Sequence, residues 1–184
     1  MFTPKFVVVS SVAAVVLAGC ATTNDSAYTP VSKGPRLGEA ASAPEIALVD
    51  ISVPPSGVGL PAGSGDARAG AKVYAARCQA CHGEKGVGKP GDPLVGGKGT
   101  LALPNAVRTV GSYWPYATTL FDYTRRAMPT TAPKSLTPDE VYAVTAYILY
   151  LNGIVGETQT LNAQTLPQVR MPNRDGFVDY SNVR

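Results

Sequence analysis

The stretch "RCQACHGEKG", residues 77–86, places Cys78, Cys81 and His82 within five consecutive positions. His82 is the only histidine of the chain, and the only other cysteine is Cys20. A structural zinc site takes four Cys or His ligands, and no further ligand follows this segment. A redox C-x-x-C motif normally follows a strand in a βαβ unit, whereas the preceding "DARAGAKVYAARC" has the pattern of a helix. Neither chemistry fits the segment.

The order C-x-x-C-H is typical of the covalent attachment of a c-type haem. In such a site both thiols add to the vinyl groups of the haem, and the histidine binds its iron. We therefore predict one covalent haem c, attached through Cys78 and Cys81 and ligated by His82.

The second axial ligand of the iron must lie elsewhere in the chain. Without a second histidine, the usual choice is a methionine thioether, which raises the reduction potential. Met1 is removed with the export signal described below, so Met128 and Met171 remain. Met128 lies in "RRAMPTTAP", where Pro129 and Pro133 favour an extended loop before the last helix. We predict that Met128 is the ligand, and that Met171, beyond that helix, packs against the core.

Two helices are predicted around this segment. Asp66 can cap the first, and Gly70 in it permits the close approach of another helix. In "SLTPDEVYAVTAYILYLNG", Thr137 and Glu140 form a capping box at the start of the second, and Gly153 ends it. The residues that recur at helical spacing and form its apolar face are Val141, Val144, Tyr147, Ile148 and Leu151.

With these helices, "CQACHG" and the later "AMP" resemble a class I cytochrome c over residues 66–153. The resemblance implies an all-α fold, a small helical bundle around one covalent haem with extended N- and C-terminal arms. It also implies that the last helix crosses the first at Gly70 and Tyr74. It further implies that a backbone carbonyl at Pro93 accepts the Nδ1 proton of His82, a role that the backbone near Gly91 could also fill.

A third helix is expected in "GSYWPYATTLFDYTRRAMP", opened by Pro115. Leu120 and Phe121 would face inward, and Asp122 and Arg126 are spaced for a surface ion pair. The same stretch holds the candidates for binding the haem propionates. Their alternative roles are packing for the aromatic residues and solvation for the arginines, and the candidates are Tyr113, Trp114, Arg125 and Arg126.

The first residues have the pattern of an export signal. Lys5 precedes the apolar stretch "FVVVSSVAAVVL", which is too short to span a membrane. The following "LAGC" resembles the lipobox of bacterial lipoproteins, so residues 1–19 are predicted to be a signal peptide and Cys20 a lipidated N-terminus; an ordinary cleaved signal is the alternative. Residues 20–43 are polar and predicted to be a flexible tether.

The two arms carry a second resemblance. The runs "PEIALVDISVPPSGVGLPAGSG" and "LPQVRMPNRDGF", with the two helical runs between them, resemble the cytochrome subunit of bacterial sulfite dehydrogenases and the haem domain of sulfur-oxidising dehydrogenases, over residues 44–178. The predicted arms are residues 44–65 and 154–184. Several apolar residues should dock on the haem domain or on a partner: Ile46, Leu48, Val49, Ile51 and Val53.

These resemblances imply an exported, lipid-anchored monohaem cytochrome on the periplasmic side of a bacterial membrane. Its electron donor would be a molybdenum-cofactor subunit that oxidises sulfite or a related sulfur oxyanion, and its acceptor a further cytochrome or an oxidase. The alternatives are a free-standing shuttle to a terminal oxidase, and a haem enzyme or gas sensor with an exchangeable sixth ligand. The net charge of +3 comes from scattered residues, so nothing indicates binding to nucleic acid.

Overall fold

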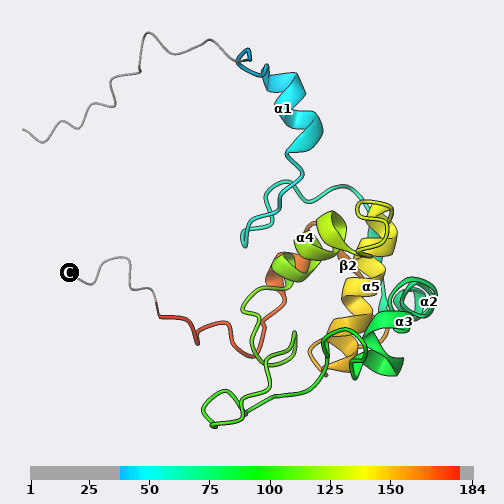
Figure 1. The fold of residues 1–184 in the computed structure, drawn as a ribbon, viewed down its shortest axis with the longest axis vertical. Coiled ribbons are helices and arrows are strands. Elements are labelled where there is room, and N and C mark those ends of the chain that lie inside the picture. Colours follow the sequence, from blue (N-terminus) through cyan, green and yellow to red (C-terminus); the bar gives the residue numbers. More distant parts are fainter. Residues whose placement is uncertain (1–37, 179–184) are drawn as a thin grey trace, which may run out of the picture. The chain divides into compact units, whose positions relative to one another are not determined.

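The computed structural model describes residues 38–178 (Figure 1). The predicted signal peptide, Cys20 and most of the predicted tether lie outside this range. Residues 41–178 belong to one compact unit. Its elements are α1 (Ala43–Val49), β1 (Ser64–Gly65), α2 (Ala67–Arg77), α3 (Gln79–His82), the 3-10 helix η1 (Glu84–Gly86), α4 (Ala117–Ala127), α5 (Pro138–Leu151), β2 (Leu161–Asn162) and the 3-10 helix η2 (Leu166–Gln168).

Helix α5 begins and ends as its sequence predicts. The Thr137 Oγ1 accepts a hydrogen bond from the backbone N–H of Glu140 at 3.3 Å, and the Glu140 carboxylate accepts one from the N–H of Thr137 at 2.8 Å. Gly153 follows the helix with a φ of +67°, a conformation that glycine adopts without strain. These local signals fix the ends of a helix that is buried along most of its length.

Helix α2 packs across α5, and the two lie side by side in Figure 1. Asp66 caps α2 by accepting a hydrogen bond from the N–H of Ala69 at 2.9 Å. A Cβ at Gly70 would overlap the backbone carbonyl of Ala143, so only glycine allows this approach. One turn later, the rings of Tyr74 and Tyr147 lie 5.3 Å apart. The crossing expected at Gly70 and Tyr74 is therefore confirmed.

The arms on both sides of the helical bundle are folded onto it. Strands β1 and β2 pair antiparallel, with Ser64 opposite Asn162 and Gly65 opposite Leu161. Met171 is only 1% exposed, which confirms that it packs in the core. Arm residues contribute several members of the core: Val53, Val155, Leu161, Leu166 and Met171.

The apolar residues of the N-terminal arm divide into two groups. Residues 43–49 form α1, which starts at a capping box of Ser42 and Glu45 and has no buried residue. Within α1, Leu48 is 81% exposed, whereas Val53 is 5% exposed and packs in the core. Docking on the haem domain is thus confirmed for Val53. Leu48 does not dock there, and for this residue docking on a partner stays a prediction.

Helix α4 begins at Ala117, two residues later than the start expected at Pro115. Its Leu120 and Phe121 are buried as predicted. Within residues 38–178, no helix has the length and hydropathy needed to cross a membrane.

Candidate haem site

A cavity of about 840 Å³ lies between α2, α3, α4 and α5. Both α3 and the C-terminal end of α2 contribute residues to its wall, and so do the segments 90–94 and 128–132. Much of the wall is apolar, including Leu94, Val110, Trp114, Leu120, Val144 and Ile148. The volume falls in the range of about 300–1,000 Å³ that is typical of cofactor and ligand pockets.

Cys78, Cys81 and His82 all line this cavity. Both cysteines are free thiols, and they lie at the start and in the middle of the single turn of α3. Burial raises the pKa of the Cys78 thiol to about 11, and the neighbouring Cys81 raises it further. Redox-active C-x-x-C motifs instead lower a thiol pKa, which is the opposite of the shift at Cys78. Among the described residues, no cluster of His, Cys, Asp or Glu side chains could hold a bare metal ion.

The imidazole of His82 is oriented by the backbone. Its Nδ1 lies 2.8 Å from the carbonyl oxygen of Asp92. A carbonyl only accepts hydrogen bonds, so Nδ1 carries the proton and the Nε2 lone pair is available to a metal. The accepting carbonyl is therefore that of Asp92 and not that of Pro93, and it belongs to the backbone near Gly91 that was the alternative expected from the sequence. Pro93 itself lines the cavity.

Met128 reaches the same cavity from the end of α4. It caps the helix, and its backbone N–H donates a hydrogen bond to the carbonyl of Thr124 at 3.1 Å. Met171 is buried elsewhere in the core and does not line the cavity. Of the two methionines considered from the sequence, only Met128 therefore shares a cavity with His82.

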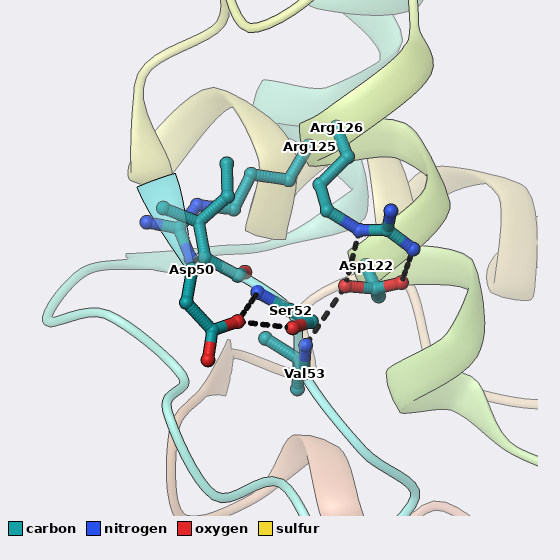
Figure 2. A network of polar contacts seen from close by, with 7 residues as sticks. Asp50, Ser52, Val53, Asp122, Arg125 and Arg126 are labelled. Atoms are coloured by element: carbon teal, nitrogen blue, oxygen red, sulfur yellow. Dashed lines mark hydrogen bonds and ion pairs between the residues drawn. The ribbon is translucent and has the colours of Figure 1, made fainter. Parts of the chain in front are cut away.

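The predicted propionate-binding residues are only partly gathered here. Trp114 lines the cavity, but Tyr113, Arg125 and Arg126 do not. The ring of Tyr113 instead packs edge-on against Phe177, at 5.2 Å between centroids. Arg126 binds Asp122 (Figure 2) and Arg125 binds the carbonyl of Ile51, so both arginines are engaged outside the cavity. The two arginines of α4 and Tyr113, which precedes that helix, thus lie outside the cavity lining, and the packing of Tyr113 is the alternative role given to it from the sequence.

Two other arginines, Arg77 and Arg108, line the cavity and were not predicted. Arg77 directly precedes Cys78, and this adjacency was a usable signal. Arg108 lies in an irregular segment, and nothing local in the sequence places it at the site. Tyr123 was also missed; it lines the cavity and contacts Trp114 edge-on, at 6.0 Å between ring centroids.

The donor set of the cavity fits haem c. Two thiols for thioether bonds lie on one wall beside an imidazole whose Nε2 is available. A thioether sulfur comes from another element, and apolar side chains fill much of the remaining wall. The two arginines supply positive charge for a group that carries carboxylates.

Comparisons with known proteins agree with this chemistry. Residues 65–148 match a family described as "Cytochrome C oxidase, cbb3-type, subunit III". The structure is similar to a chain of the sulfane dehydrogenase SoxCD from Paracoccus pantotrophus, with a TM-score of 0.74 and 40% sequence identity over 82% of this chain and 76% of that one. A comparison with curated proteins found no match.

The fold and the site thus define a small helical domain built for covalent haem. The protein belongs to the class I c-type cytochromes, the family that also includes the similar chain of SoxCD. It is accordingly a haem c protein.

Proposed function

We propose that the chain is a one-electron carrier with one haem c bound through Cys78 and Cys81, ligated by His82 and Met128. The observation that carries this proposal is that all four side chains line one cavity. When bound, the haem supplies a one-electron redox couple at its iron.

Each residue has a distinct role in this proposal. The carbonyl of Asp92 holds the Nδ1 proton of His82, which fixes the ring and strengthens Nε2 as a donor. The soft thioether of Met128 favours ferrous iron and raises the reduction potential. The apolar wall keeps water from the iron. Arg77 and Arg108 take the role of propionate partners that was expected of Arg126.

We further propose that the electron donor is a molybdenum-containing dehydrogenase that oxidises sulfite or a related inorganic sulfur compound. This is supported by the similarity to a chain of a sulfane dehydrogenase and by the sequence resemblance to the cytochrome subunit of sulfite dehydrogenases. The sulfur compound would lose two electrons on the other chain. This chain would take them one at a time and pass them to a further cytochrome or an oxidase.

The domain organisation proposed from the sequence places this work outside the cytoplasm. Residues 1–19 would direct export, Cys20 would carry the lipid anchor, and residues 20–43 would tether the haem domain, residues 66–153, with its arms, 44–65 and 154–184, to the membrane.

Purification of the native protein under mild conditions tests the proposed partner. We expect molybdenum to co-purify in stoichiometric amount, and sulfite or another inorganic sulfur compound to reduce the haem in a stopped-flow experiment. A protein that purifies without molybdenum, and whose haem no sulfur compound reduces in membrane extracts, would support the free-standing shuttle instead. Rapid binding of cyanide or carbon monoxide by the isolated protein would favour an enzyme or a sensor.

A further inference from the structure

The segment of residues 51–55, here called the strap, crosses one face of α4 and is hydrogen-bonded to it at three positions. The strap carbonyl of Ile51 accepts from Arg125 at 3.1 Å, and that of Pro55 accepts from Thr118 at 3.1 Å. Between them, the N–H of Val53 donates to Asp122 at 2.8 Å. Positions 118, 122 and 125 follow the helical repeat, so all three bonds lie on one side of α4.

The other side of α4 faces the haem cavity. Leu120, Tyr123 and Thr124 line that cavity, and Met128 follows directly at the end of the helix. Because the N–H of Met128 is bonded to Thr124, the position of its side chain depends on where α4 lies. Helix α4 is therefore held between the strap and the cavity.

Asp122 is the central contact of this arrangement (Figure 2). It is only 8% exposed, and both of its carboxylate oxygens are used. Oδ1 accepts from the N–H of Val53 and from Nε of Arg126, and Oδ2 accepts from Nη2 of Arg126. Charge-assisted hydrogen bonds to a buried carboxylate are among the stronger polar contacts in proteins. Asp122 thus joins the N-terminal arm to the helix that carries Met128.

We infer that Asp122 is a positioning residue for Met128: by fixing α4 to the strap, it keeps the thioether at the iron. The inference rests on the proposed function, since it needs haem in the cavity with Met128 as its second axial ligand. His82 does not depend on such support, because it adjoins Cys81, which would be covalently attached. Met128 has no attached neighbour, so the support of α4 determines how often its sulfur stays in place.

The test uses the full-length holoprotein with Asp122→Ala and Asp122→Asn. Asp139→Ala is the matched control, since the Asp139 carboxylate also accepts from an arm N–H, that of Ser64 at 2.7 Å, but lies on α5 and does not line the cavity. The readouts are the thioether-to-iron charge-transfer band of the ferric protein and the dissociation constant of added imidazole. The free energy of unfolding is measured alongside them, and Met128→Leu is the reference for complete loss of the ligand.

For Asp122→Ala we expect a weaker band and imidazole binding tighter by about tenfold or more, the scale on which removing a residue that supports a metal ligand acts. For Asp122→Asn we expect both readouts to lie between those of Asp122→Ala and the wild type, because the amide oxygen can still accept the hydrogen bond from the N–H of Val53. Asp139→Ala should leave both readouts unchanged, whatever stability it loses. If Asp122→Ala does not fold, Asp122→Asn still decides the question.

The inference would be overturned if the Asp122 variants kept the charge-transfer band and the imidazole affinity of the wild type. It would also be overturned if Asp139→Ala changed both readouts as much as Asp122→Ala does. A band that survives Met128→Leu would instead show that the proposed ligand is wrong. The two failures are therefore distinguishable.

Discussion

Gly70 of α2 lies against the backbone of Ala143 of α5, with no room for a side chain between them. This contact sets how closely the two helices approach, and the Tyr74–Tyr147 contact one turn later depends on it. The haem-binding segment follows directly at the end of α2. The position of Cys78 relative to α5 is therefore governed by a residue without a side chain.

The first prediction is that Gly70→Ala destabilises the protein by about 1–3 kcal/mol, the usual cost of forcing extra atoms into a packed core. Gly156→Ala is the control, because a Cβ at position 156 meets open space. It should change the free energy of unfolding by no more than about 0.5 kcal/mol. Urea denaturation measures the free energy of unfolding of both variants. If Gly70→Ala cost no more than Gly156→Ala, the close contact of α2 with α5 would not limit the size of residue 70.

The second prediction separates the two methionines. Met128→Leu should abolish the thioether-to-iron band and lower the reduction potential, because leucine has no donor atom. Met171→Leu should keep both properties and cost less than about 1.5 kcal/mol of stability, since it replaces one buried apolar side chain by another of similar volume. Redox titration and absorption spectra check this. The reverse pattern would move the ligand to the C-terminal arm.

The third prediction concerns Tyr74, whose hydroxyl donates to the carbonyl of Gly83 at 2.9 Å. Burial raises its pKa to about 12 from an ordinary value of 10.0. The folded state thus keeps a proton that the unfolded state loses, and stability should fall as the pH rises from 10 to 12. Tyr74→Phe should cost about 0.5–1.5 kcal/mol at neutral pH for the lost hydrogen bond and flatten this alkaline decline. An unchanged decline would mean that another group titrates.

The fourth prediction concerns Asp122 at acid pH. Burial alone would raise its pKa, but hydrogen bonds from Arg126 and from the N–H of Val53 outweigh burial and hold the pKa below the ordinary value of 3.8. Its contribution to stability is therefore complete above that value and is lost as the pH falls through the lower, folded-state pKa. The stability of Asp122→Asn should vary less with pH in this window. Acid titrations followed by circular dichroism measure how steeply stability falls with pH. The fall should be steeper for the wild type than for Asp122→Asn, and equal slopes would contradict the prediction.

The fifth prediction tests the anchor proposed at Cys20. Each buried methylene contributes about 0.8 kcal/mol to membrane binding, so a multiply acylated cysteine holds a protein stably where one chain would not. Cys20→Ser should release a soluble cytochrome with an unchanged haem spectrum into the periplasmic fraction. A variant that stays with the membranes would contradict the lipoprotein assignment.

The features that the sequence predicted well depend on neighbouring residues. The capping box of Thr137 and Glu140, the end of α5 at Gly153 and the cluster of Cys78, Cys81 and His82 each fall within a few positions. The same kind of signal was present for α1, where Ser42 and Glu45 form a capping box, but no helix was predicted there. The capping box of Ser42 and Glu45 could therefore have predicted the start of α1 from the sequence.

The features that failed depend on tertiary structure. Arg126 pairs with Asp122 as their spacing on one helix predicts, but it does not line the haem cavity, whose lining depends on how the helices pack together. The Asp92 carbonyl binds His82 because of how one loop turns, which no spacing rule resolves to a single residue. The pairing of β1 with β2 joins segments almost 100 residues apart, and two-residue strands leave no periodic pattern.

The packing of α2 on α5 also has a consequence for the order of events during folding. Contacts between segments far apart in the chain form slowly, because the intervening loop must be closed first. Helix α2 and the two thiols are synthesised before α5, so the wall that α5 contributes does not yet cover them. We expect the thioether bonds to form in this interval, while Cys78 is still in water and its thiol ionises more readily than in the finished fold. In the completed domain, burial raises the pKa of the Cys78 thiol and so disfavours its reactive thiolate form.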